Sequence, residues 1–129
     1  MLPDIIKFNE KGLIPAIAQD YKTGDVLMMA WMNKESLELT LREKVVCYFS
    51  RSRQKLWKKG EISGQIQNLK EVLIDCDGDS ILLKVEQIGV ACHTGRKNCF
   101  FYKLEDDNKI TINQEILISG EKLYGKKDD

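Results

Sequence analysis

Three carboxylates and a thiol lie within five residues in the stretch Asp75-Cys76-Asp77-Gly78-Asp79. Carboxylate oxygen is a hard ligand that suits Mg²⁺ or Ca²⁺, whereas thiolate is a soft ligand that suits zinc. Three acids this close repel one another unless a cation or a proton relieves them. Cys92 and Cys99 follow further along the chain. The sequence therefore carries ligands for two different metals.

The conformation of the stretch from Asp75 to Asp79 decides whether its aspartates and its cysteine can serve one metal site or two. If it is extended, its three aspartates lie on one face and Cys76 on the other, because side chains alternate along a strand. The alternative is an acidic hairpin turn, since Asp-Gly is a strong turn signal. An EF-hand loop is excluded because its twelfth position, Glu86, falls in a strand-like run instead of a helix.

Three cysteines, Cys76, Cys92 and Cys99, are the candidate zinc ligands. The spacing from Cys92 to Cys99 is wider than the Cys-x₂-Cys of structural zinc fingers. Three protein ligands and one open position are typical of catalytic zinc, whose bound water has a pKa of about 7. Cys47 lies in an apolar segment and is interpreted as a buried thiol. His93, the only histidine, is either a proton shuttle or a zinc ligand, although a lone histidine is usually only packed or exposed.

The segment 51–60 carries five cations and no acid. It is a solvated basic loop, a nucleic-acid surface in which Trp57 stacks on bases, or a binding site for discrete phosphate groups. The residues after it, Glu61, Ser63 and Gly64, add a carboxylate, a hydroxyl and a position where backbone can approach a ligand closely.

Composition narrows the class of protein. The chain has 129 residues, 43% of them hydrophobic, which predicts one folded domain over residues 1–129. Twenty basic and twenty acidic residues cancel, so no global charge favours nucleic acid or membrane. No apolar run approaches the ~20 residues of a membrane span, and no secretory signal is visible. We therefore expect a cytoplasmic protein whose cysteines are ligands or buried thiols.

Hydrophobic patterning predicts a mainly β domain with one clear α-helix. Residues 13–20 and 26–32 predict a hairpin, Asn33 a helix N-cap, and residues 34–44 an amphipathic helix. Residues 51–64 predict a long loop, and the tail from Ile110 predicts one further strand or helix with frayed residues 125–129. Further strands are expected at 45–50, 66–76, 81–87 and 98–104. Seven candidate strands in so short a chain predict a folded mixed sheet or pseudobarrel.

In the order of its motifs, the sequence resembles the phosphoribosyl-AMP cyclohydrolases of histidine biosynthesis. The resemblance runs from about residue 12 to 102. It is carried by the motifs at residues 12–20, 23–28, 30–33, 48–53, 56–61, 63–64, 75–79 and 91–96.

The resemblance implies a pseudobarrel in an intertwined homodimer, with one zinc and one magnesium in each subunit. Asp75, Asp77 and Asp79 match the magnesium ligands. Cys76, Cys92 and Cys99 match the zinc ligands, with Cys76 given by the partner subunit. The implied reaction is hydrolysis of the N1–C6 bond in the adenine ring of 1-(5-phosphoribosyl)-AMP, a small-molecule substrate.

For that reaction we expect His93 to be the catalytic residue, as a proton shuttle, and cationic side chains to clamp the two 5′-phosphates. The expected substrate-binding residues are Arg51, Ser52, Arg53, Lys55, Trp57, Glu61, Ser63, Gly64, Thr94 and Arg96.

Two departures from the family pattern stand out. Gln65 occupies a position where many members have His or Asn. Residues of about 105–129 match no family motif and are expected to form a variable C-terminal extension. We expect the single-function form, without a fused pyrophosphohydrolase domain. The rival hypothesis is a structural zinc module that binds RNA through residues 51–59. Charge balance and an open zinc position argue against it, so neither nucleic acid nor membrane is expected as a partner.

Overall fold

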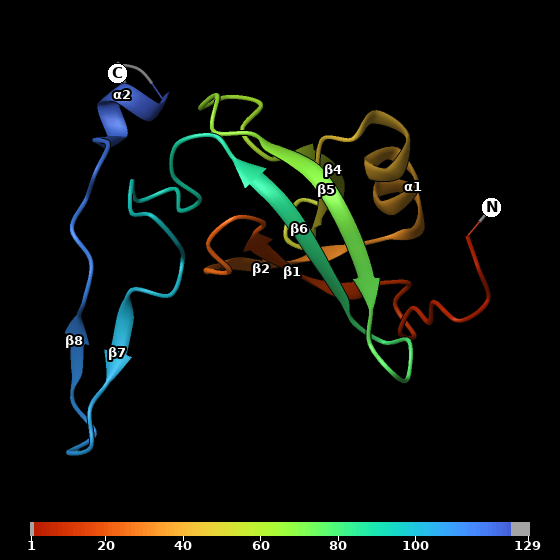
Figure 1. Cartoon of the computed structure of the whole chain (residues 1–129), viewed down its shortest axis with the longest axis horizontal. Coiled ribbons are helices and arrows are strands. Elements are labelled where there is room, and N and C mark those ends of the chain that lie inside the picture. The colour runs from red at the N-terminus through yellow and green to blue at the C-terminus, as the bar shows by residue number, and fades with distance from the viewer. Residues whose placement is uncertain (1, 125–129) are drawn as a thin grey trace.

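A four-stranded mixed sheet forms the centre of the fold, seen in a computed structural model that describes residues 2–124. Its strand order is β2-β1-β6-β5, with β1 at Ile14–Asp20, β2 at Val26–Met32, β5 at Gln67–Ile74 and β6 at Ile81–Gln87 (Figure 1). β1 pairs parallel with β6, and the other two pairs are antiparallel hairpins. With 36% strand and 12% helix, the prediction of a mainly β fold is confirmed.

Alternating side chains of β1 and β6 build the core. Every second residue of these strands is buried because successive side chains of a strand point to opposite faces. The core is completed by β2, by Leu37 of the helix and by Tyr48. The alternating buried residues are Ile14, Ala16 and Ala18 in β1 and Ile81, Leu83 and Val85 in β6.

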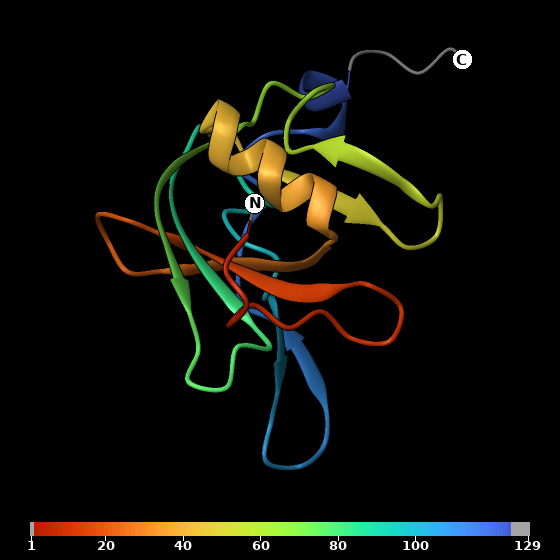
Figure 2. The same ribbon diagram turned by 90° about the vertical axis from the view of Figure 1, so that its right-hand side faces the viewer.

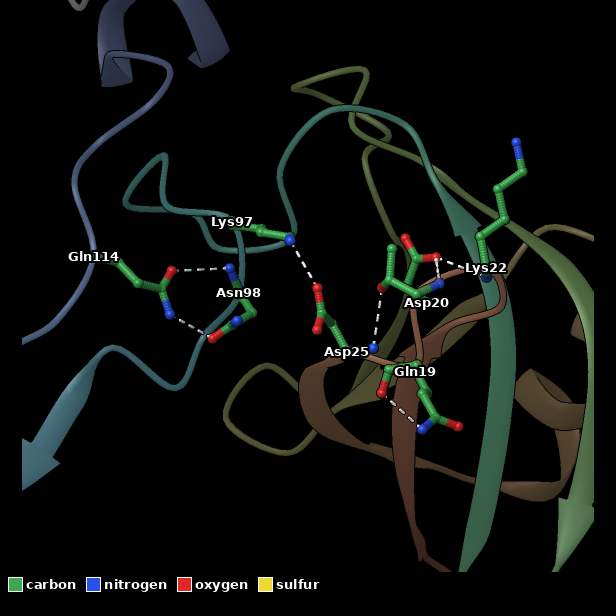
Figure 3. Close-up of polar contacts among 9 residues, drawn as sticks. Gln19, Asp20, Lys22, Asp25, Lys97, Asn98 and Gln114 are labelled. Atoms are coloured by element: carbon green, nitrogen blue, oxygen red, sulfur yellow. Dashed lines mark hydrogen bonds and ion pairs between the residues drawn. The ribbon is translucent and has the colours of Figure 1, made fainter.

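The predicted hairpin of β1 and β2 is confirmed, and side chains close its turn. The Asp20 carboxylate accepts hydrogen bonds from the backbone N–H groups of Lys22 and Thr23 at 2.8 and 3.0 Å. The Thr23 hydroxyl accepts one from the N–H of Asp25 at 3.1 Å (Figure 3). This is the usual way in which Asp and Thr stabilise a turn.

The predicted helix is α1, Lys34–Glu43, and Asn33 is its N-cap as expected. The Asn33 side chain accepts a hydrogen bond from the N–H of Ser36 at 2.8 Å, and the Ser36 hydroxyl accepts one from the N–H of Asn33 at 2.9 Å. This reciprocal pair is a capping box. The helix ends one residue earlier than predicted, because Lys44 takes a left-handed conformation at φ 62°.

The expected long loop over residues 51–64 is wrong in part. β3, Cys47–Ser50, turns back into β4, Lys55–Lys58, and the two strands pair antiparallel. The strand β4 was not predicted because both of its end residues are exposed lysines. Its inner residues, Leu56 and Trp57, are half-buried. A two-stranded sheet thus replaces most of the loop.

The C-terminal part forms a second hairpin. β7, Tyr102–Leu104, pairs with β8, Ile110–Ile112, and this hairpin stands away from the four-stranded sheet (Figures 1 and 2). The strand expected at 98–104 begins only at Tyr102, because the Asn98 side chain bonds the N–H of Phe100 and the N–H of Cys99 bonds Leu27. The short helix α2 is Gly120–Tyr124, and the predicted fraying of residues 125–129 lies outside the described residues.

The described part of the chain, residues 2–124, contains no helix long and apolar enough to cross a membrane.

Candidate active site

A pocket of about 410 Å³ opens between β4, the loop that follows it and the segment that carries Cys92 and Cys99. β4 contributes two lysines, Lys55 and Lys58, and between them the apolar side chains of Leu56 and Trp57, and α2 contributes Tyr124 from the C-terminal part. Seven residues predicted from the sequence line this pocket: Arg53, Lys55, Trp57, Glu61, Ser63, His93 and Cys99.

The local structure orients the pocket wall. Trp57 packs its ring against Tyr48 at 5.1 Å between centroids, and the Glu61 carboxylate accepts a hydrogen bond from the N–H of Lys58 at 2.7 Å. Gly60 has φ 83°, and a Cβ there would lie 2.5 Å from the backbone of Gln65. Only glycine fits this turn, which folds the Glu61 and Ser63 segment over the pocket.

Lys59 and Tyr124 are pocket residues that the sequence analysis missed. Lys59 is buried, and its ammonium donates a hydrogen bond to the carbonyl oxygen of Ala91. Burial lowers the pKa of Lys59. The sequence showed Lys59 only as one cation of a basic segment, and its burial depends on the loop that folds over it. For Tyr124 the local sequence held no signal, because contact with the pocket arises from the path of the whole C-terminal segment.

Cys99 lines this pocket, and Cys92 lies next to Cys99. Cys92 is buried, Cys99 is half-buried, and the Thr94 hydroxyl lies 3.0 Å from the Cys92 sulfur. Burial, and then the neighbouring Cys92 thiol, raise the pKa of Cys99 to about 12, while the Lys59 cation acts to lower it. Two soft donors side by side fit zinc, which also binds further ligands.

Contacts with the rest of the chain hold the Cys92–Cys99 loop in place. The N–H of Cys99 donates to the carbonyl oxygen of Leu27 in β2 at 2.7 Å. Lys97 forms an ion pair with Asp25 at 2.7 Å, and Asn98 exchanges two hydrogen bonds with Gln114 (Figure 3). The loop is therefore fixed both to the β1–β2 hairpin and to the C-terminal segment.

The three aspartates meet in a turn, so of the two conformations considered for Asp75–Asp79 the structure shows the hairpin turn and not the extended stretch. The N–H of Gly78 bonds the carbonyl oxygen of Asp75 at 3.1 Å, and Gly78 has φ 78°. The Asp75 carboxylate accepts hydrogen bonds from the Ser80 hydroxyl at 2.7 Å and from the N–H of Asp79 at 3.0 Å. The stretch therefore forms the hairpin turn and also gathers its three carboxylates into one cluster.

The carboxylate cluster fits a hard cation. One oxygen from each of Asp75, Asp77 and Asp79 lies within 4.8 Å of the others, and all three side chains are exposed. Hydrogen bonding by Ser80 lowers the pKa of Asp75 to about 2, whereas the neighbouring carboxylates of Asp77 and Asp75 raise the pKa of Asp79. A divalent cation would relieve this crowding of like charges.

Cys76 lies far from the other two candidate zinc ligands of the same chain. It is exposed in the turn before β6, whereas Cys92 follows the opposite end of β6 (Figure 1). Seven extended residues span roughly 23 Å. Among residues 2–124, no group of three potential ligands includes Cys92 or Cys99.

Five predicted substrate-binding residues lie outside the pocket lining. The guanidinium of Arg51 lies 4.9 Å from the ring centre of Trp31, and Ser52 lies in the turn between β3 and β4. Gly64, at φ 80°, closes the loop by donating to Gly60, and Thr94 contacts Cys92. Arg96 donates to the carbonyl oxygen of Gln114 at 3.2 Å. Their proposed contacts with substrate stay predictions.

The fold and the site define a small, mainly β protein with a carboxylate cluster that could hold a metal ion and a cationic pocket. The family model of phosphoribosyl-AMP cyclohydrolase matches residues 28–101. The chain belongs to the phosphoribosyl-AMP cyclohydrolase family, which is a family of hydrolases.

Relatives named phosphoribosyl-AMP cyclohydrolase match nearly the whole chain. The protein of Chlorobium limicola is 59% identical over 124 residues, which are 96% of this chain and 90% of the relative. The protein of Alcanivorax borkumensis is 58% identical over 95% of this chain and 86% of its own length. The protein of Granulibacter bethesdensis is 57% identical over 95% of both chains.

Proposed function

We propose that this chain hydrolyses the N1–C6 bond of the adenine ring of 1-(5-phosphoribosyl)-AMP, the step that opens the purine ring in histidine biosynthesis. The observation that carries this proposal is the pocket in which cationic side chains, His93 and Cys99 meet, in a chain of this family. N1 of this substrate bears a ribose and a positive charge, which makes C6 electrophilic.

The cationic wall suits the phosphate groups of the substrate. Arg53 and Lys55 line the pocket with exposed side chains, and a guanidinium can bind a phosphate through two hydrogen bonds. Trp57 offers an aromatic face to a purine ring. The 5′-phosphates would therefore lie toward Arg53 and Lys55, with the base nearer Trp57 and Cys99.

His93 and the cysteines would serve the reacting atoms. Cys92 and Cys99 would hold zinc, which when bound supplies a water with a pKa of about 7 as the nucleophile. His93 is exposed on the pocket lining next to Cys92, so its imidazole can take up a proton and pass it to the leaving nitrogen. Glu61 and Ser63 add polar groups that can orient the base and ribose.

A second copy of the chain would complete the site. Cys76 and the three aspartates occupy one turn, so a second subunit that supplies Cys76 as a zinc ligand also brings its carboxylate cluster close to the pocket. Mg²⁺ held by Asp75, Asp77 and Asp79 would then bind a phosphate or orient the substrate.

The projecting hairpin supports such a homodimer. The large apolar side chains of β7 and β8 are more than half exposed, and the two strands pair only with each other in the described part of the chain. These side chains are cross-strand partners, and exposed apolar side chains gathered in this way are typical of an interaction site. The exposed side chains are Tyr102, Leu104, Ile110 and Ile112.

The test is turnover of phosphoribosyl-AMP by the purified, metal-replete protein. We expect the purine absorbance to change as the ring opens and the product to have gained one water by mass spectrometry. The rival RNA-binding function predicts no turnover and an affinity for RNA that falls steeply with salt. That pair of results would contradict the proposal.

A further inference from the structure

The side chain of Gln65 bridges two walls of the pocket. Its Oε1 accepts a hydrogen bond from the N–H of Val90 at 2.9 Å, and its Nε2 donates one to the carbonyl oxygen of Ser63 at 3.2 Å. Ser63 lies on the pocket wall that also carries Glu61, and Val90 lies two residues before Cys92. One amide group thus contacts both the substrate-facing loop and the segment that leads into Cys92 and His93.

Gly89 leaves room for this amide. It has φ 70°, and a Cβ added there would lie 1.6 Å from the Gln65 Oε1. No other residue type at position 89 would allow the Gln65 side chain to stay where it is. The two positions therefore fit each other closely.

A second glutamine anchors the bridge to the core. The Gln87 Nε2 donates to the carbonyl oxygen of Gln65 at 3.0 Å and lies 3.3 Å from that of Val90. The Gln87 Oε1 accepts from Gln67 at 2.9 Å, and the Gln67 Oε1 accepts from the hydroxyl of Tyr48 at 2.7 Å. Gln67 and Tyr48 are fully buried, so the chain of hydrogen bonds begins in the rigid core.

We propose that Gln65 is a positioning residue for the reaction, which rests on the proposed function. It fixes the distance between the loop of Glu61 and Ser63 and the segment of Cys92 and His93. The amide suits this role because it has an acceptor oxygen and a donor nitrogen, and each makes one of the two hydrogen bonds of the bridge. Displacing catalytic groups by about 1 Å can reduce turnover about 100-fold.

The experiment compares Gln65→Met, which keeps the length of the side chain and removes both hydrogen bonds, with Gln65→Glu, which keeps an acceptor for the N–H of Val90. The matched control is Gln19→Met, because Gln19 also bonds a single carbonyl oxygen, that of Gly24 at 2.9 Å, in a turn of the β1–β2 hairpin. Steady-state kinetics of the zinc-replete proteins are measured alongside zinc content. Since His93 is the only histidine, its imidazole signals in a tag-free, histidine-labelled protein report the site without any activity.

We expect Gln65→Met to lower kcat about 10- to 100-fold with a smaller change in KM, to keep its zinc, and to shift the His93 signals. Gln65→Glu should fall between Gln65→Met and the wild type, and Gln19→Met should match the wild type. If Gln65→Met does not fold, Gln65→Glu alone carries the test through the same two readouts.

Wild-type kcat and unmoved His93 signals in the folded Gln65 variants would overturn the proposal, as would equal effects of Gln65→Met and Gln19→Met. If the wild-type protein itself opens no purine ring, the proposed function fails. The His93 signals still decide in that case whether Gln65 positions the segment.

Discussion

The ammonium group of Lys59 donates a hydrogen bond to the carbonyl oxygen of Ala91, the residue that precedes Cys92. Lys59 is only 8% exposed, and its charge lies close enough to Cys99 to favour the thiolate. A buried lysine costs free energy unless its charge is compensated. We propose that thiolates of the neighbouring Cys92 and Cys99, bound to metal, are the compensating charges.

We predict that Lys59→Met weakens zinc retention about 10-fold or more, because the partners that surround metal ligands typically contribute that much to affinity. The carbonyl of Ala91 also loses its donor. Competition with a chromophoric chelator measures the zinc affinity, and Lys34→Met, at an exposed helix start, is the control. Equal zinc affinity in the two variants would show that Lys59 does not contribute to zinc binding.

The helices and hairpins that depend on residues close together in the sequence could be predicted from the sequence. The helix follows from Asn33 and Ser36, whose capping box is local, and the first hairpin follows from Asp20 and Thr23 in its turn. The parallel pairing of β1 with β6 joins residues 65 positions apart, and no local pattern encodes such a pairing. β4 was missed because its end residues are exposed lysines.

The site shows the same division between local and distant contacts. The carboxylate cluster could be predicted because Asp75, Asp77 and Asp79 lie in one turn. The role of Gln65 could not, because its partners include Val90, twenty-five residues away. The separation of Cys76 from Cys92 depends on the pairing of β5 with β6, whereas the sequence predicted two strands flanking an Asp-Gly-Asp turn without their pairing.

The carboxylate turn and the thiols should bind metal independently within one chain. We predict that Asp77→Asn keeps zinc near its normal content but weakens Mg²⁺ dependence and substrate binding, because losing a carboxylate charge lowers the affinity for a hard cation. Metal analysis and Mg²⁺ titration of turnover measure the two effects. Loss of zinc in proportion to activity would show that the two sites are not separate.

Tyr48 should make stability depend on alkaline pH. Burial raises the pKa of Tyr48 because it disfavours the phenolate. A raised pKa in the folded state contributes stability that is fully present below the unfolded value of about 10 and is lost as the pH rises above it. We therefore predict that the free energy of unfolding of the wild type falls more steeply above pH ~10 than that of Tyr48→Phe.

At neutral pH, Tyr48→Phe should be less stable than the wild type by about 1–3 kcal/mol, because the buried Gln67 Oε1 loses its donor. Urea unfolding in reducing buffer at several pH values measures both effects, with the exposed Tyr21→Phe as control. Parallel curves for the wild type and Tyr48→Phe above pH ~10 would show that Tyr48 does not carry the dependence.

The shared site predicts complementation between inactive variants. In a heterodimer of Cys76→Ala and Cys92→Ala, one zinc site loses both mutated thiols and the other keeps all three. At random 1:1 mixing half of the dimers are heterodimers, so activity should reach about one quarter of the wild type by mass action. If mass spectrometry confirms subunit exchange and the mixture stays inactive, Cys76 acts within its own chain.

Zinc content and turnover, measured together in single cysteine variants, test the central claim most directly. We predict that Cys92→Ala and Cys99→Ala lose zinc and nearly all opening of the purine ring, because in the proposed reaction the nucleophile is a water on the zinc that these thiols would hold. Cys47→Ala should keep both, because Cys47 is buried in β3, where its sulfur lies 3.8 Å from the carbonyl oxygen of Tyr48. Full turnover by Cys92→Ala without zinc would contradict the account.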